Sequence, residues 1–87
     1  MSEPRPFGHP PFGVATSVNE LQPGDVVVYP QSASDRRSQL LLTRVEADGV
    51  YGRRVHPEPW EREVEFVVIA RQVAAGVRIL SRGGPDA

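Results

Sequence analysis

The chain has 87 residues, a formal net charge of −1 and no cysteine. This length argues for a single domain, and the lack of cysteine excludes disulfides, thiolate metal sites and thiol catalysis. Because the net charge is close to zero, the composition does not indicate a globally basic nucleic-acid-binding protein.

Composition also bears on compartment and source. No apolar run approaches the ~18 residues that a helix needs to span a bilayer, and residues 1–6 lack the apolar region of a signal peptide. Small secreted domains usually need disulfides, so we expect a soluble cytoplasmic protein. All ten basic residues are arginine. We interpret this as the codon bias of a GC-rich bacterial or phage genome, with selection for bidentate guanidinium contacts as the alternative.

Residues 1–16 form a proline- and glycine-rich arm in which a Pro-Phe-Gly triplet occurs twice. Its four prolines disfavour a helix and favour extended backbone, so we predict a flexible arm. Its two phenylalanines, Phe7 and Phe12, are candidates for docking on the domain or on a partner. Solvated disorder alone does not call for two large apolar rings.

The next signals predict a short helical turn and a first strand. The S-x-x-E pattern at residues 17–20 is that of a capping box, and it predicts one helical turn over residues 18–21. The Pro-Gly pair at residues 23–24 suits the central positions of a type II turn. Asp25 then opens a strand predicted over residues 26–29.

Two further strands follow a polar loop. An apolar-rich stretch predicts a strand over residues 39–46, and the Ala-Asp-Gly sequence at residues 47–49 is a tight hairpin signal. The third strand is predicted over residues 50–55. Gly52 inside this strand indicates a bulge or the close approach of another backbone.

The C-terminal part predicts two more strands. Residues 63–70 first alternate between glutamate and apolar residues, then become apolar on both faces at Val67 and Ile69. This pattern predicts a strand whose second half is covered. A 3₁₀ turn or bend over residues 71–74 leads to a last strand over residues 76–80.

Five short strands separated by turn signals, with no helix of ordinary length, predict an all-β fold over residues 17–82 and a disordered tail over residues 83–87. A closed small barrel would remove exposed sheet edges. Residues 21–28, Leu-Gln-Pro-Gly-Asp-Val-Val-Val, resemble the segment that leads into the first strand of SH3-like small barrels. The resemblance, carried as a pattern over residues 18–80, implies a five-stranded SH3-like barrel but decides no function.

Arginines concentrate in the middle of the chain. Residues 35–56 hold five arginines and three acidic residues, a local net charge of +2, whereas residues 57–70 hold four glutamates and one arginine, a local net charge of −3. A cluster of guanidinium groups could engage phosphates or a carboxylate-rich partner. The alternative is a solvated face that pairs with Glu63 and Glu65. The candidate arginines are Arg36, Arg37, Arg44, Arg53 and Arg54.

Aromatic side chains supply a second candidate surface. SH3-like barrels often bind ligands on aromatic residues exposed between two loops, so the resemblance implies a platform of Tyr29, Tyr51 and Trp60 with His56 at its edge. Rings beside arginines also suit single-stranded nucleic acid, because bases stack on them. The alternative for Trp60 is a lid over one end of the barrel, held by the flanking prolines.

Catalytic and metal-binding patterns are weak. Neither histidine has further ligands at a plausible spacing, so we predict no metal and no cofactor. General acid–base chemistry needs two positioned groups, and His56 with Glu58 or Glu61 is the only candidate pair. The sequence has no phosphate-binding loop and no nucleophile elbow, and a serine–lysine mechanism is impossible without lysine. We therefore predict that the chain is not an enzyme, with a ribonuclease using His56 as an alternative.

These observations favour a protein-interaction module with a protein partner. A small bacterial or phage accessory factor that docks on a larger assembly fits the size and the near-neutral charge. The alternative is a small barrel that binds RNA or single-stranded DNA through the arginine cluster. We expect a monomer or weak dimer and no membrane contact.

Overall fold

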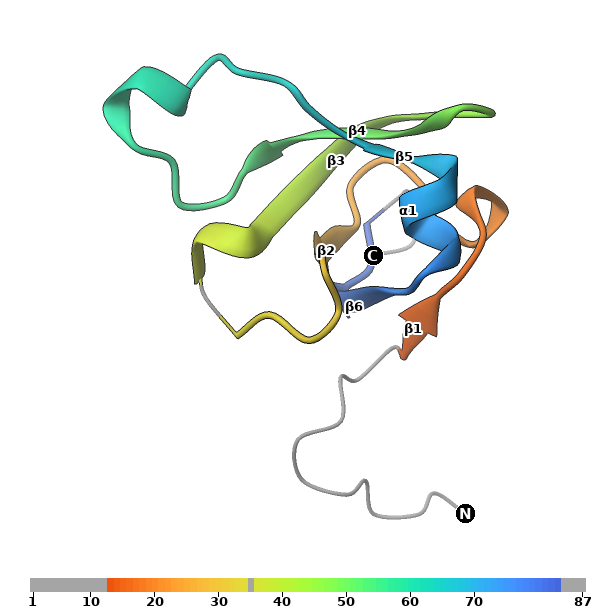
Figure 1. Cartoon of the computed structure of the whole chain (residues 1–87). Coiled ribbons are helices and arrows are strands. Elements are labelled where there is room, and N and C mark those ends of the chain that lie inside the picture. The colour runs from red at the N-terminus through yellow and green to blue at the C-terminus, as the bar shows by residue number, and fades with distance from the viewer. Residues whose placement is uncertain (1–12, 35, 84–87) are drawn as a thin grey trace.

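The computed structural model describes residues 13–34 and 36–83. Six strands form one antiparallel sheet in the order β1-β6-β2-β3-β4-β5 (Figure 1). The all-β class is therefore confirmed, whereas Phe7 and Phe12 lie outside the described residues. The strands are β1 (Val14–Ala15), β2 (Val26–Val28), β3 (Gln39–Glu46), β4 (Gly49–Arg54), β5 (Phe66–Ile69) and β6 (Val77–Ser81).

Helical structure is limited to short segments between the strands. Three are 3₁₀ turns and one, α1, is a short α-helix that replaces the bend predicted over residues 71–74. No helix in the described part of the chain is long and apolar enough to cross a membrane. The helical segments are η1 (Val18–Glu20), η2 (Arg36–Ser38), η3 (Pro59–Glu61) and α1 (Ala70–Ala74).

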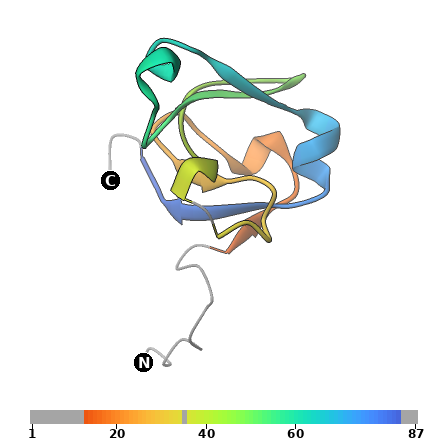
Figure 2. The same cartoon turned by 60° about the vertical axis from the view of Figure 1, so that its left-hand side comes forward.

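The predicted five-stranded closed barrel is wrong in two respects. The sheet has a sixth strand, β1, formed by two residues that the sequence placed in the flexible arm and paired with β6. It is also open, because β1 and β5 stand at its two ends and do not pair with each other. The sheet nevertheless curls, and Figure 2 shows β4 and β6 on opposite sides of the molecule.

The core fills the inside of this curled sheet. Val73 of α1 is fully buried, so the short helix closes one end of the core. Burying an aliphatic side chain of this size contributes roughly 1.5–3 kcal/mol. The inward residues of the strands, together with Val73, form one cluster: Ala15, Leu21, Val27, Leu40, Leu42, Val50, Val68, Val73, Val77 and Ile79.

The capping box and the type II turn are confirmed. The N–H of Asn19 donates to Ser17 Oγ (3.2 Å), and the N–H of Ser17 donates to Glu20 Oε1 (3.2 Å). In the following turn the N–H of Asp25 donates to the carbonyl of Gln22 (3.2 Å). Gly24 has φ 96°, the left-handed value that a type II turn requires at its third residue.

Asp25 connects this turn to the segment that follows β6. The residue is fully buried, and its carboxylate accepts the N–H of Gln22 (3.0 Å) and the N–H of Gly83 (2.9 Å). The Arg82 guanidinium lies 3.6 Å from the same carboxylate. The Pro-Gly-Asp motif therefore stabilises the fold, and Gly83, assigned by the sequence to the tail, is held in place.

A bulge in β3 faces Gly52. Leu42 pairs with Gly52 and Arg44 pairs with Tyr51, which leaves Thr43 as the extra residue. A Cβ atom on Gly52 would lie 2.5 Å from the carbonyl oxygen of Leu41, so the close backbone approach predicted at this glycine is confirmed. Two consecutive residues of β3, Thr43 and Arg44, are exposed as a result.

The strand predicted over residues 63–70 is shorter than expected. β5 contains only four residues, because residues 63–65 lie in the turn and loop before it and α1 begins at Ala70. Phe66 and Val68 face the core as the alternation predicts. The prediction that the second half is covered is wrong for the described structure, because Val67 is 45% exposed and Ile69 is 38% exposed.

Candidate binding site

Trp60 is the most exposed large apolar residue in the described part of the chain. It lies on η3, the turn between β4 and β5, and is 69% exposed. A lid over the core would be buried, so the alternative in which Trp60 closes one end of the fold does not hold.

The turn that carries Trp60 is anchored by its neighbour. Glu61 is 2% exposed, and its carboxylate accepts the N–H of Glu58 (2.9 Å), which closes η3 on itself. Arg54 Nε lies 3.7 Å from the same carboxylate, and the Arg54 guanidinium stacks 4.5 Å from the centre of the Phe66 ring. The buried side chain of Glu61 thus fixes the turn, and the neighbouring Trp60 side chain is directed to solvent.

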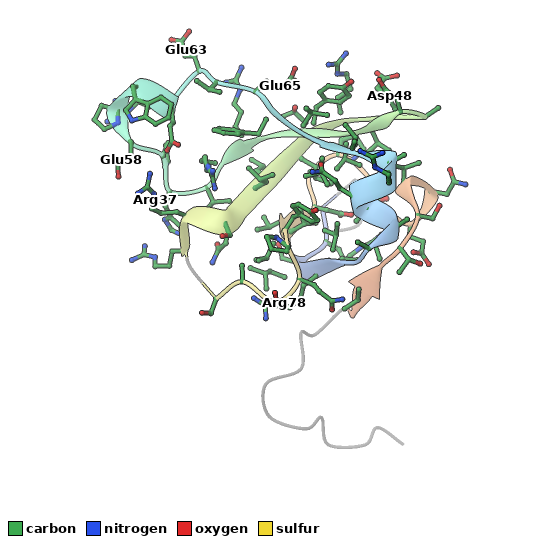
Figure 3. The ribbon with its side chains drawn as sticks, in the orientation of Figure 1. Arg37, Asp48, Glu58, Glu63, Glu65 and Arg78 are labelled. Atoms are coloured by element: carbon green, nitrogen blue, oxygen red, sulfur yellow. The ribbon has the colours of Figure 1, made fainter. Side chains whose placement is uncertain are left out.

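A second loop joins this end of the molecule. The Arg36 guanidinium of η2 donates to His56 Nδ1 (3.2 Å), which places η2 beside the loop that leads to η3. Figure 3 shows Arg37 and Glu58 at the same end of the ribbon. We call this surface the loop end, and it consists of Arg36, Arg37, His56 and Trp60.

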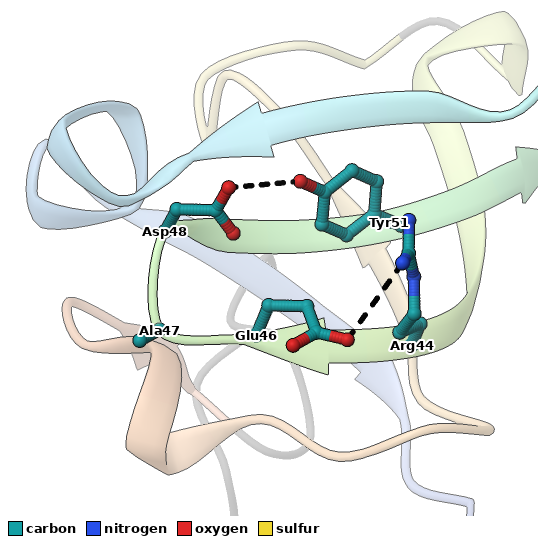
Figure 4. Close-up of a pocket in the computed structure, with 5 residues that line it drawn as sticks. All are labelled: Arg44, Glu46, Ala47, Asp48 and Tyr51. Carbon is teal, nitrogen blue, oxygen red and sulfur yellow. Dashed lines mark hydrogen bonds and ion pairs between the residues drawn. The ribbon is translucent and has the colours of Figure 1, made fainter.

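Another group of predicted residues lies on the β3–β4 hairpin. An open pocket of about 380 Å³ is lined by Arg44, Glu46, Ala47, Asp48 and Tyr51 (Figure 4). The Tyr51 hydroxyl donates to Asp48 Oδ2 (3.0 Å). This hydrogen bond, followed by desolvation and the negative charge of Asp48, raises the pKa of Tyr51 above its ordinary value, while Arg44 acts in the opposite direction.

Arg44 in this pocket is surrounded by its own counter-ions. Its guanidinium lies 4.0 Å above the Tyr51 ring, 3.2 Å from a carboxylate oxygen of Glu65 and 3.7 Å from one of Glu46. The positive charge is therefore balanced within the chain, and the pocket is poorly suited to capture a free anion.

The structure does not gather the predicted arginines into one patch. Arg36 and Arg37 lie at the loop end, whereas Arg44 lies in the hairpin pocket. Arg53 and Arg54 are consecutive residues of a strand, so they point to opposite faces of the sheet. Arg53 is exposed, and Arg54 is partly buried beside Glu61.

The predicted aromatic platform is not assembled either. Tyr29 packs against the core, and Tyr51 contacts Arg44 and Asp48 near the β3–β4 turn. Trp60 follows the other end of β4. Of the platform predicted from the SH3-like resemblance, the loop end therefore holds Trp60 with His56 but neither tyrosine.

Of the two candidate acid–base partners of His56, Glu61 is engaged elsewhere. The Glu61 carboxylate is turned inward to Arg54 and to the backbone of Glu58, while His56 contacts Arg36. Within residues 13–34 and 36–83, no group of three His, Asp or Glu side chains is arranged to hold a metal ion.

Sequence reasoning missed the anchoring role of Glu61. The signal was present, because Glu58 and Glu61 have the spacing of a capping box with a proline at the first position of the turn. It also missed that Val67 and Ile69 form an uncovered apolar strip, since their apolar character was taken to indicate burial.

Comparison with protein-family models, curated proteins and solved structures found no match to this chain.

Proposed function

We propose that this chain is a protein-binding domain whose principal contact is Trp60 at the loop end. The observation that carries the proposal is the contrast between two neighbours, a tryptophan that is 69% exposed and a glutamate that is 2% exposed. Tryptophan is among the residues most enriched in the energetic centres of protein interfaces.

The anchored turn supports this role energetically. Ordering a mobile side chain or loop on binding costs roughly 0.5–1.5 kcal/mol for each rotamer-rich side chain. Here the turn is already fixed by the Glu61–Glu58 hydrogen bond and by Arg54. A partner pocket that receives the indole therefore recovers most of the burial energy.

The surroundings of Trp60 indicate the chemistry of the partner. Arg36 and Arg37 give the loop end a positive charge beside His56, so a protein surface with an apolar pocket flanked by carboxylates would be complementary. A bacterial or phage accessory factor fits the proposal.

The nucleic-acid alternative has weaker support. Trp60 beside two arginines suits base stacking, but Arg44 and Arg54 are paired with glutamates inside the chain. Fewer guanidinium groups are then available to neutralise phosphates, and phosphate neutralisation supplies most of the non-specific affinity for nucleic acid.

The experiment places a photo-crosslinking phenylalanine analogue at position 60 of the full chain, expressed in its own source cells. We expect a protein adduct at this position, because the side chain reaches the partner directly. The matched control carries the analogue at Ala75, an exposed position after α1, and should give no such adduct.

Trp60→Ala then tests the energetic role. Against the partner identified by crosslinking, we expect the dissociation constant to rise by at least about tenfold, measured by calorimetry. The free energy of unfolding should change by less than about 0.5 kcal/mol, since the residue is exposed. Adducts to RNA or DNA, or equal adducts at positions 60 and 75, would contradict the proposal.

A further inference from the structure

β5 is an end strand of the sheet with no partner on its outer side. β4 pairs with its inner side through Val50↔Val68 and Tyr51↔Val67, and no other strand of the described chain adjoins it. Natural proteins usually protect such an edge with charges, prolines or a covering segment. This strand is Phe-Val-Val-Ile and carries no such protection within its four residues.

The hydrogen-bond pattern identifies which backbone groups face outward. The N–H of Ala70 donates to the carbonyl of Asp48 on the β4 side (2.8 Å). Backbone groups alternate along a strand, so those of Phe66 and Val68 also face β4 and those of Val67 face away. The N–H of Ile69 is already bonded to the Gln72 side chain (3.1 Å). Val67 therefore presents an unpaired donor and an unpaired acceptor at the open edge.

Exposed apolar side chains accompany these backbone groups. Val67 and Ile69 lie on the outer face of the sheet, and both are exposed. Tyr51 on β4 is directly opposite Val67 and half-buried. The side chains of a strand added beside β5 would pack against this strip, and its backbone would pair with the unpaired groups of Val67.

Two charges stand at equal distances along the chain from Val67. Glu63 precedes it by four residues and Arg71 follows it by four. Both are exposed, and neither has an ion pair or hydrogen bond within the described residues. Figure 3 shows Glu63 pointing away from the body of the molecule. Glu65, by contrast, reaches across the sheet to Arg44 on β3 (3.2 Å).

We propose that β5 pairs with β5 of a second copy of this chain, in antiparallel orientation about a two-fold axis at Val67. Val67 of each copy then exchanges both backbone hydrogen bonds with Val67 of the other. Glu63 lies in the turn before β5 and Arg71 in the first turn of α1 after it, so this arrangement places Glu63 of one copy at the same end of the strand pair as Arg71 of the other, and the two-fold axis repeats this pair. Arg71 lies in the first turn of α1, so its long side chain spans the end of the strand.

The order of residues along β5 and its flanks favours a second copy of this chain as the partner. An antiparallel partner must present an acidic residue first and a basic residue eight positions later, with an apolar residue midway, and β5 with its flanks has this order. Two four-residue strands bury far less than the 1,200–2,000 Å² of a standard stable interface. The dimer is therefore weak and forms at high protein concentration.

The experiment compares the full chain with Glu63→Arg, Arg71→Glu and the double variant by sedimentation equilibrium. We expect each single change to raise the dimer dissociation constant about tenfold, because it creates like-charge pairs at both ends. The double variant restores opposite charges and should return to within about twofold of the unchanged chain. Circular dichroism of each monomer checks that the fold is retained.

A second measurement identifies the strand directly. In a mixture of isotope-labelled and unlabelled chains, we expect magnetisation transfer between the Val67 methyl groups of the two copies. Trp60→Ala should dimerise like the unchanged chain, which separates this interface from the loop end. A chain that stays monomeric at the highest concentration tested would overturn the proposal. So would a double variant as weak as the single ones, or loss of the dimer in Trp60→Ala.

Discussion

Asp25 has a buried carboxylate that accepts hydrogen bonds from Gln22, in its own turn, and from Gly83, 58 residues later. Replacing it with alanine leaves the N–H groups of Gln22 and Gly83 without their acceptor, and each unsatisfied buried group costs roughly 1–3 kcal/mol. We expect Asp25→Ala to lower the free energy of unfolding by about 3 kcal/mol. Urea denaturation followed by circular dichroism measures this change.

Asp48 provides the matched control for this experiment. Its carboxylate is also hydrogen-bonded, to Tyr51, but the residue is exposed on the hairpin turn. We expect Asp48→Ala to change the free energy of unfolding by no more than about 0.5 kcal/mol. Equal losses in the two variants would show that the buried position of Asp25 has no special importance.

Tyr51 carries a prediction about pH. Its pKa is raised above the ordinary value of about 10, mainly by the hydrogen bond to Asp48. The protonated phenol is thus favoured in the folded state, so its stabilising contribution is complete below pH ~10 and disappears as the pH rises through the folded-state pKa. In a Tyr29→Phe background, the tyrosinate absorbance titration should move to lower pH when Asp48 is replaced by asparagine. An unchanged titration curve would disprove this assignment of cause.

At the scale of elements, the β3 bulge depends on Gly52. A methyl group there would meet the carbonyl of Leu41 at 2.5 Å, and because that atom belongs to the backbone, the strands must separate. We expect Gly52→Ala to destabilise the fold by about 2–4 kcal/mol, measured by thermal unfolding. Arg53→Ala, next along the same strand but exposed, should have little effect, and similar losses would refute the steric explanation.

The elements with strong local signals could be predicted from the sequence. The bounds of β3 match the prediction, and the capping box at Ser17 and the turn at Gly24 have the expected geometry. These features depend on residues that are neighbours in the sequence. Turn and capping chemistry therefore determines them without reference to the rest of the fold.

The elements that depend on distant partners could not be predicted. β1 contains two residues and has no periodicity of its own, because its hydrogen bonds come from β6. β5 begins only at Phe66, where its pairing with Gly52 of β4 starts. Alternation of side chains also cannot decide whether a curled sheet closes, since an open edge and a closed one bury the same inward residues.

For the whole molecule, the candidate site was only partly predictable. The sequence singled out Trp60 and the arginines as contact residues, and the loop end contains four of the candidates. It could not show that Arg44 meets Glu65, 21 residues away, or that Arg54 meets Glu61. The charge segregated along the chain is therefore partly compensated in three dimensions, and of the two glutamates named in the solvated-face alternative Glu65 pairs with an arginine whereas Glu63 does not, among the described residues.

The position of β2 has a consequence for biosynthesis. β2 lies between β3 and β6, and Asp25 before it bonds Gly83, 58 residues later. Contacts of such long sequence separation slow folding, because the chain must lose much conformational entropy before they form. During translation, β2 and the β3–β4 hairpin leave the ribosome before β6 has been made. The edge of β2 that pairs with β6 then has unpaired backbone groups. The nascent polypeptide must avoid aggregation until β6 has left the exit tunnel.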